Sequence, residues 1–287
     1  TQAKTLFPYT TLFRSPEQLN RNPLAVTFAV WRAIFLREAL DRLFDMRFAW
    51  FWLLAEPVLH IAFITFVMTV IRVRTVGNAD VVVWIIVGML AFFLFRRTAV
   101  QVTYAVDSNR PLFTYRQVKP FDPAIARAVL EAFLMAIIAG VILLTAALLG
   151  HDTFPADTLL VMQAVFGLWL FGIGYGLVAS VLMALVPEME HVLKIVMLPL
   201  YLISGVIWPL ASIPMPYRDI LMINPIAHGL ELVRMGFFPY YHTVPGLSMP
   251  YLFAWGVVSI FLGLLLYRRF AIQDRKSTRL NSSHLVL

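Results

Sequence analysis

Six long apolar runs separated by short polar segments dominate the chain. They cover residues 48–71, 81–104, 124–149, 158–186, 192–210 and 249–267. Each is close to or longer than the roughly 20 apolar residues that a helix needs to cross the hydrocarbon core of a bilayer. The pattern predicts an all-α integral membrane protein with six transmembrane helices.

Two of these runs contain residues that interrupt a simple span. The second includes the pair Arg96 and Arg97, which leaves an earlier end of this span, near residue 95, open. The fifth is short and contains Pro199 and Pro209. Proline removes a backbone donor and bends a helix, so this run predicts a kink or break that neighbouring helices must satisfy.

Residues 24–47 form an amphipathic segment that is too charged to span. Leu36, Leu40 and Phe44 share one helical face, and Glu38 and Arg42 lie away from it. This distribution predicts a helix that lies in the cytoplasmic interface. Two interpretations stay open, a simple membrane-skimming anchor and a docking surface for a cytoplasmic partner.

A second segment that does not span, residues 211–248, lies between the fifth and sixth runs. Its prolines separate two short helical stretches, at about 217–223 and 226–236. The segment is too polar to cross the bilayer and too apolar for a free loop. It predicts an outer re-entrant segment packed on protein.

Composition agrees with a membrane protein, since 60% of the residues are hydrophobic, 14% are charged and the mean hydropathy is +0.79. A soluble domain averages about 45–50% apolar and about 25% charged residues. The chain has no cysteine, which excludes disulfides and thiolate metal sites.

The two ends of the chain differ in character from the rest. TLFPYTTLFRS at residues 5–15 and DRKSTRLNSSH at residues 274–284 both resemble translated sequencing adapters. We expect residues 1–15 and 274–287 to be artefacts that flank one transmembrane domain at residues 16–273.

Lysine and arginine are distributed unevenly between the two sides of the expected spans. Fourteen of them fall in segments that share a side with both termini, against four on the opposite side. Because basic residues concentrate on the cytoplasmic side, both termini are expected in the cytoplasm.

Motifs of enzymes and nucleotide-binding proteins are missing from the sequence. It contains no G-x-x-x-x-G-K-[ST] loop and no H-E-x-x-H, G-x-S-x-G or S-x-x-K pattern. We therefore expect a non-enzyme without catalytic residues, metal site or nucleic-acid partner.

Ionisable residues at membrane depth are candidates for function because burying charge there is costly. Glu56 precedes Pro57 in the first span, and His60 follows one turn later. We take these two, with Trp50 and Trp52, as transport-path candidates; a packing kink and an aromatic belt are the alternatives. Glu131 is explained by a local pair with Arg127, four residues before it.

Two sequence blocks resemble the ABC-2-type exporter permeases. In the first block, Trp52, Leu54, Glu56 and Pro57 match that family's W-x-L-x-E-P-like stretch. The second matches its N-P-x-x-H-x-x-E-x-x-R run and points to the inner-membrane subunits of capsular-polysaccharide exporters. The residues that match this outer re-entrant motif are Asn224, Pro225, His228, Glu231 and Arg234.

The resemblance implies a homodimeric permease in the bacterial inner membrane that exports a lipid-linked polysaccharide to the periplasm. ATP and Mg²⁺ would be bound by a separate P-loop ATPase subunit, and this chain would bind no cofactor. A periplasmic co-polymerase and an outer-membrane export pore are further implied partners. The residues that we expect to dock the ATPase are Arg37, Glu38, Arg42 and Arg110.

Other functions stay open on sequence alone. An ABC-2 permease for O-antigen, teichoic acid or a drug is the nearest alternative. A secondary carrier or channel, and a lipid-modifying membrane enzyme, belong to other classes.

Overall fold

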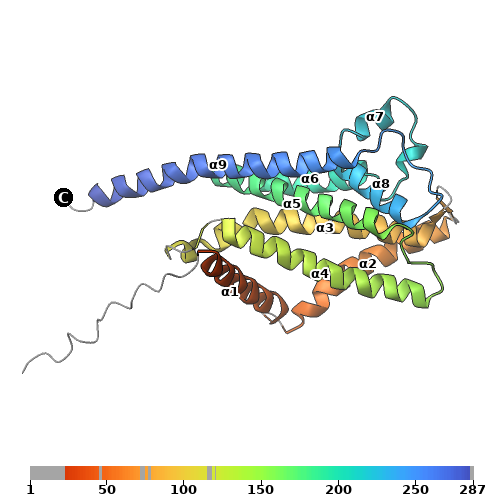
Figure 1. Ribbon diagram of the computed structural model, residues 1–287, viewed down its shortest axis with the longest axis horizontal. Helices are drawn as coiled ribbons and strands as arrows, with labels where there is room; N and C mark the ends of the chain where they lie inside the picture. The colour runs from red at the N-terminus through yellow and green to blue at the C-terminus, as the bar shows by residue number, and fades with distance from the viewer. Residues whose placement is uncertain are drawn as a thin grey trace, which may run out of the picture.

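The computed structural model describes the backbone of residues 23–44, 47–71, 75–76, 79–114, 118–119 and 121–284, with most side chains up to Arg269. The segment 1–15 lies outside the described residues, and so do the side chains of 274–287. The described helices, drawn in Figure 1, are α1 (Pro23–Phe44), α2 (Ala49–Val70), α3 (Val81–Ser108), α4 (Phe121–Leu148), α5 (Thr158–Leu185), α6 (Met189–Ile203), α7 (Tyr217–Leu221), α8 (Pro225–Phe237) and α9 (Met249–His284).

Short elements connect some of these helices. The 3₁₀ helices η2 (Arg110–Thr114) and η3 (Leu210–Ser212) follow α3 and α6. The strands β1 (Thr75–Val76) and β2 (Ala79–Asp80) form an antiparallel pair in which Thr75 lies opposite Asp80. Asp80 also caps α3, because its carboxylate accepts a hydrogen bond from the backbone N–H of Val82 at 2.8 Å.

The all-α membrane class is confirmed. Within the described residues, five helices are long and apolar enough to cross a membrane, namely α2, α3, α4, α5 and α9. They coincide with five of the six expected spans. The sixth, α6, has 15 residues and ends at Ile203, so the count of six stays a prediction.

Where the second span leaves the membrane stays a prediction, but the helix α3 itself continues through Arg96 and Arg97 to Ser108. The reason is an ion pair across the bundle, because Arg97 Nε lies 3.2 Å from the Glu131 carboxylate of α4. A paired guanidinium can stay in a helix that leaves the hydrocarbon.

The helix α3 forms the core of the bundle, because 83% of the residues in its apolar 18-residue stretch are buried. It contacts α2, α4, α5 and α8 and lies at the centre of Figure 1. Trp84, Phe92 and Phe95 are among its fully buried side chains. A helix that is apolar all around fits this central position.

Glycines let α5 approach both of its main neighbours. A Cβ on Gly176 would lie 2.6 Å from the Val102 side chain of α3, and one on Gly174 would lie 2.1 Å from Ser259 of α9. Such separations are too short for real Cβ atoms, so these positions require glycine. The G-x-G-x-G run at 172–176 is therefore a helix-packing element.

Different elements gather at the two ends of the bundle. Figure 1 shows α1 and the end of α9 at one end, and the β1–β2 pair, α7 and α8 at the other. At the α8 end, Asp157 N–H donates to Gly236 O at 2.8 Å and His151 pairs with Asp80. Each end therefore has its own set of polar contacts.

Candidate functional site

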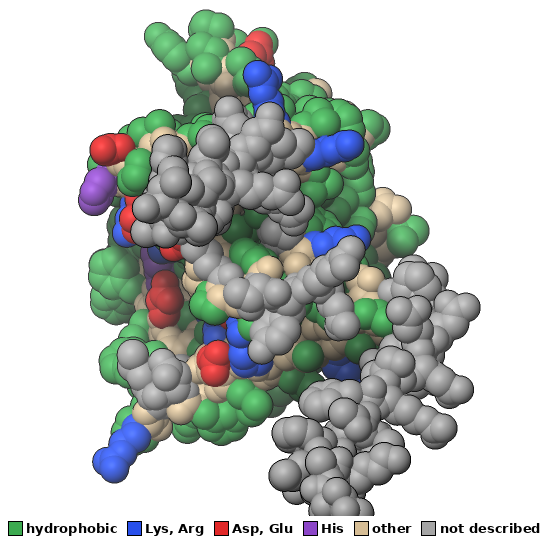
Figure 2. Space-filling view, turned by 90° about the vertical axis from the view of Figure 1, so that its left-hand side faces the viewer, with side chains coloured by type: hydrophobic (Ala, Val, Ile, Leu, Met, Phe, Trp, Pro, Cys, Tyr) green, Lys and Arg blue, Asp and Glu red, His purple; other side chains and the backbone are tan. Residues whose placement is uncertain are grey.

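The helix α1 turns Glu38 and Arg42 toward the bundle, whereas its other charged residues, Arg32, Arg37 and Asp41, are exposed. Ile34 and Glu38 are buried, whereas Leu36, Leu40 and Phe44 are 49%, 58% and 71% exposed. The apolar face therefore points away from the protein, as expected for a helix that contacts lipid at an interface. Figure 2 views this end and shows Lys and Arg side chains among acidic and apolar ones.

Glu38 anchors α1 to α3 and α4. Its carboxylate accepts two hydrogen bonds from Arg127 at 3.0 Å each and one from Asn109 at 3.1 Å. Burial alone would raise the pKa of Glu38, but the bonds from Arg127 and Asn109 outweigh it and lower the pKa below 4.5. Glu38 is therefore held ionised inside the contact.

Glu131 is the second anchor of α1. This fully buried carboxylate pairs with Arg42 of α1 and with Arg97 of α3. The expected local pair with Arg127 is wrong, because Arg127 instead extends to Glu38. Burial lowers the pKa of Arg42 to about 10, which leaves its guanidinium charged at neutral pH.

These two anchors form one set of polar side chains, which we name the α1 cluster. Trp31 adds a further contact, since its indole N–H donates to Asp122 at 2.8 Å. The members of the α1 cluster are Arg37, Glu38, Arg42, Arg97, Asn109, Arg127 and Glu131.

The four residues expected to dock the ATPase differ in how many of their contacts lie within this chain. Glu38 and Arg42 make their hydrogen bonds to other residues of the same chain. The Arg37 side chain is 42% exposed, although it also donates to Asn109. The side chain of Arg110, the first residue of η2, lies outside the described residues. Docking of a partner by these residues stays a prediction.

The transport-path candidates all lie on α2. Of the five long apolar helices, only α9 is less buried than α2. Trp50 and Trp52 are 55% and 63% exposed on its outer surface. Glu56 lines a cavity of about 170 Å³ together with Arg96, Arg97 and Gln101 of α3. The His60 ring packs edge-on against Phe93 of α3 and lies 5.8 Å from the ring of Tyr201 of α6. The four candidates therefore do not converge on one site.

The residues of the outer motif are all placed by α8. Asn224 caps this helix by accepting from the Ile226 N–H at 3.0 Å, and Pro225 follows as the first helical residue. The Asn224 amide donates to Ser204 at 2.8 Å. His228 Nε2 lies 2.8 Å from Met222 O, and its Nδ1 accepts from Ser248 N–H, so its two nitrogens are both occupied.

Arg234 is fully buried and closes the break after α6. Its Nη1 donates to Gly205 O at 2.8 Å and its Nη2 donates to Val206 O at 2.9 Å. Gly205 has a φ of +73°, which turns the chain away from the helix axis. Pro199 and Pro209 predicted a break here. The backbone carbonyls that the break leaves without helical partners are hydrogen-bonded by Arg234, a side chain of the neighbouring helix α8.

Two more groups complete the surroundings of Arg234. Glu231, also fully buried, pairs with Arg234 Nη1 at 2.9 Å. The guanidinium carbon lies 3.5 Å above the Trp84 ring, and the Trp84 N–H donates to Tyr241. We call this set the α8 cluster, with the members Trp84, Gly205, Val206, Glu231, Arg234 and Tyr241.

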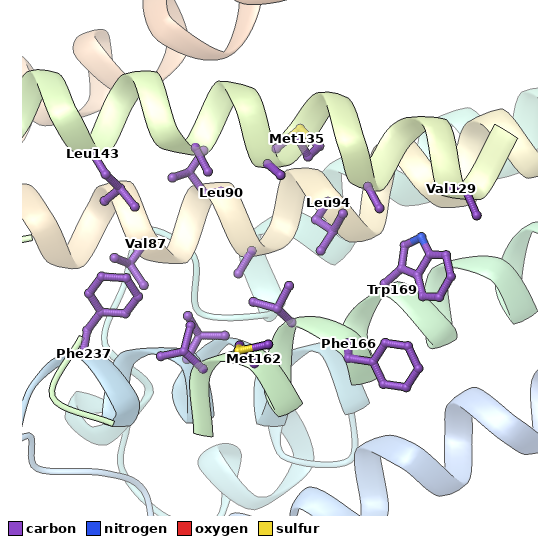
Figure 3. Close-up of a pocket in the computed structure, with 17 residues that line it drawn as sticks. Val87, Leu90, Leu94, Val129, Met135, Leu143, Met162, Phe166, Trp169 and Phe237 are labelled. Carbon is purple, nitrogen blue, oxygen red and sulfur yellow. The ribbon is translucent and has the colours of Figure 1, made fainter. Parts of the chain in front are cut away.

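An apolar cavity lies between α3, α4, α5 and α8. It has a volume of about 520 Å³, and the residues that line it are all apolar. Figure 3 shows Leu90, Leu94, Met135 and Phe166 around it. Its lining suits an apolar group, and the one N–H on a lining side chain, that of Trp169, donates to Ala128 O. Among the described residues, no group of three His, Asp or Glu could hold a metal ion.

Sequence reasoning missed the partners of the charged residues. Asn109 and Trp84 carry no motif, and the pairs of Glu38 and Glu131 join residues 89 positions apart. The one available signal was the number of charged residues inside and beside apolar segments, since such charges require partners.

Comparison with known proteins agrees on one family. The model of the ABC-2 type transporter family matches residues 29–238. The polysialic acid transport protein KpsM of Escherichia coli is 34% identical over 237 residues, which is 82% of this chain and 91% of that protein.

Two further relatives are named as capsule polysaccharide export inner-membrane proteins. CtrC of Neisseria meningitidis is 26% identical over 83% of this chain and 90% of its own length. BexB of Haemophilus influenzae is 23% identical over 88% of this chain and 94% of its own length.

Proposed function

This chain belongs to the ABC-2 type transporter family, and we propose that it is the permease of an ATP-driven exporter of capsular polysaccharide. The polymer, linked to a lipid, would move from the cytoplasm to the periplasm through the bacterial inner membrane. The carrying observation is the likeness to the polysialic acid transport protein over 91% of that protein's length.

The energy source is expected in another subunit. The sequence has no P-loop, so ATP and Mg²⁺ would be bound by a separate cytoplasmic ATPase. The exposed part of Arg37, together with Arg110 and the 3₁₀ helix η2, is the surface that we propose for docking it. Glu38 and Arg42 would then transmit force, because they tie α1 to the spanning helices α3 and α4.

We also propose a homodimer with both termini in the cytoplasm. Exposed apolar side chains on α2 and α6, among them Phe63, Phe66 and Leu198, support a contact of these helices with a second protomer or with lipid. The excess of Lys and Arg on the side of the termini supports the orientation.

Copurification tests the proposed function. The permease, expressed with the genes that adjoin it, is expected to bring a P-loop ATPase and to stimulate ATP hydrolysis. Arg37→Glu should reduce the amount of ATPase retained, because it reverses the most exposed charge among the docking residues whose side chains the structure describes. Arg268→Glu, an exposed change on α9, should not.

The alternatives give different results. A permease that copurifies with no ATPase would contradict the proposal and favour a carrier or channel. An ATPase stimulated by O-antigen, teichoic acid or a drug, and not by capsular polymer, would keep the exporter class and change its substrate.

A further inference from the structure

Arg96 lies on α3 inside the second expected span, and it is a cation without an acidic partner among the described residues. Eight residues, a rise of about 12 Å, separate it from the expected end of the span at residue 104. Its guanidinium makes no hydrogen bond and no ion pair with any residue that the structure describes. Because charge beside apolar segments is costly, an arginine there that has no hydrogen bond or ion pair is suited to bind an anionic group.

The neighbouring cations differ from Arg96 because each has an acidic partner. Arg97 and Arg42 share Glu131, and Lys194 pairs with Glu190 at 2.6 Å. Glu56, which lies in the same cavity as Arg96, interacts electrostatically with Arg97.

Two cavities meet at Arg96. The first, of about 170 Å³, lies between α2 and α3 and contains Glu56 and Gln101. The second, of about 260 Å³, lies between α3, α5 and α6 and contains Thr103 and Tyr175. Arg96 lines both, so its guanidinium can reach a ligand in either.

Two further polar side chains near Arg96 are free to make hydrogen bonds to a ligand. Within the described part of the chain, the Gln101 amide and the Tyr175 hydroxyl make no hydrogen bond. His60 of α2 and Tyr201 of α6 lie close enough for the charge of Arg96 to act on them. An amide, a phenol and aromatic rings beside a guanidinium suit a sugar that carries an anionic group.

We infer that Arg96 binds an anionic group, a carboxylate or a phosphate, of the transported polymer near the cytoplasmic end of the bundle. This inference rests on the proposed function and deepens it, since it selects acidic over neutral polymers. Gln101 and Tyr175 would donate hydrogen bonds to the same sugar from the two sides of Arg96.

Binding of a carboxylated sugar tests the inference. The probe is a short oligomer of sialic acid, with a neutral malto-oligosaccharide of equal length as the comparison. Wild-type permease with its ATPase is placed in nanodiscs of neutral phosphatidylcholine, and the dissociation constant of each oligomer is measured.

Arg96→Gln should weaken binding of the acidic oligomer by about tenfold, since a charge-assisted hydrogen bond is stronger than a neutral one. Binding of the neutral oligomer should not change. Arg268→Gln removes the same charge from an exposed position on α9 and should leave both constants unchanged. Arg96→Lys should retain part of the affinity, because it keeps the charge but loses the planar fork.

Two results would overturn the inference. One is equal binding of the acidic oligomer by the wild type and Arg96→Gln. The other is a contact with lipid headgroups, which would appear as loss of oligomer binding when anionic phosphatidylglycerol is added and as less copurified phosphatidylglycerol in Arg96→Gln.

Failure of the proposed function would look different. A wild type that retains no ATPase would contradict the exporter itself, and the inference with it. A wild type that retains the ATPase and exports polymer, with Arg96→Gln exporting and binding equally well, would remove only the role of Arg96.

Discussion

Arginine–carboxylate clusters occur at both ends of the bundle, but they differ in what they join. In the α8 cluster, Arg234 and Glu231 are three residues apart on one helix and both are fully buried. In the α1 cluster, Glu38 and Arg127 are 89 residues apart, and the Arg127 side chain is 11% exposed.

The α8 cluster completes hydrogen bonds that the backbone cannot make for itself. Without Arg234, the carbonyls of Gly205 and Val206 would lose these donors inside the bundle, where a missing bond is expensive. The α1 cluster instead connects a peripheral helix to the core through side chains alone. The first arrangement fixes a shape, and the second is suited to transmitting movement between α1 and the spanning helices.

The largest effect is expected from Arg234→Met. The change leaves Glu231 buried without its cation and frees two carbonyls, and breaking a buried pair from one side costs about 3–5 kcal/mol. We expect strongly reduced thermal stability of the detergent-solubilised protein, measured by its unfolding temperature. The matched control is Arg32→Met, an exposed position on α1, which should change little.

A double variant separates the ion pair from the carbonyl contacts. Glu231→Leu combined with Arg234→Met removes both charges and should recover part of the lost stability. Full recovery would mean that the bonds to Gly205 and Val206 contribute nothing, and the α8 cluster would then not be what stabilises the break after α6.

The separation of the paired residues along the chain also decides how much of each cluster the sequence can predict. The N-P-x-x-H-x-x-E-x-x-R spacing places Glu231 and Arg234 on one helix face, and the apolar runs locate five spans. The sequence could also indicate a break near Pro199 and Pro209. It could not tell that Arg234 would satisfy that break, because backbone carbonyls carry no residue-specific signal.

The ion pairs of the α1 cluster could not be predicted from the spacing of residues along the chain. A spacing of four made Arg127 the obvious partner of Glu131, yet the helices α1, α3 and α4 decide the pairing by their packing. Amphipathicity predicted α1 itself, but not that Glu38 and Arg42 would face the bundle. Long-range charge pairing depends on helix arrangement, which periodicity does not encode.

A smaller effect is expected from Gly88→Ala, which tests how tightly the α8 cluster is packed. A Cβ at Gly88 would lie 2.2 Å from Arg234 Nη2, so the guanidinium would have to leave its place over Trp84. Overpacking of this kind costs roughly 1–3 kcal/mol, which should be measurable as a lower unfolding temperature.

Gly140 on α4 provides the matched control for Gly88→Ala. Nothing lies within 4 Å of a Cβ at that position. Gly140→Ala should leave stability equal or raise it by up to about 1 kcal/mol, because alanine is the better helix former. Equal losses at both positions would show that helix glycines matter in this bundle for a reason other than space for Arg234.

The smallest effect is expected from acid on the α1 cluster. The pKa of Glu38 is lower in the folded protein than its ordinary 4.5, so the packing of α1 gains stability above pH 4.5 and loses it as the pH falls below that value. A fluorophore on Leu36→Cys, in a chain that has no other cysteine, should report α1 by its anisotropy.

Asp122 and Glu131 also face α1. The diagnostic is therefore the difference between the labelled wild type and the labelled Glu38→Gln variant. In that variant, α1 should be more mobile at neutral pH and should change less on acidification, because its amide cannot titrate. An identical acid response in both proteins would remove Glu38 from the connection between α1 and the bundle. Protonation of Glu38 would then not loosen α1, and the α1 cluster would hold its helix at low pH as firmly as at neutral pH.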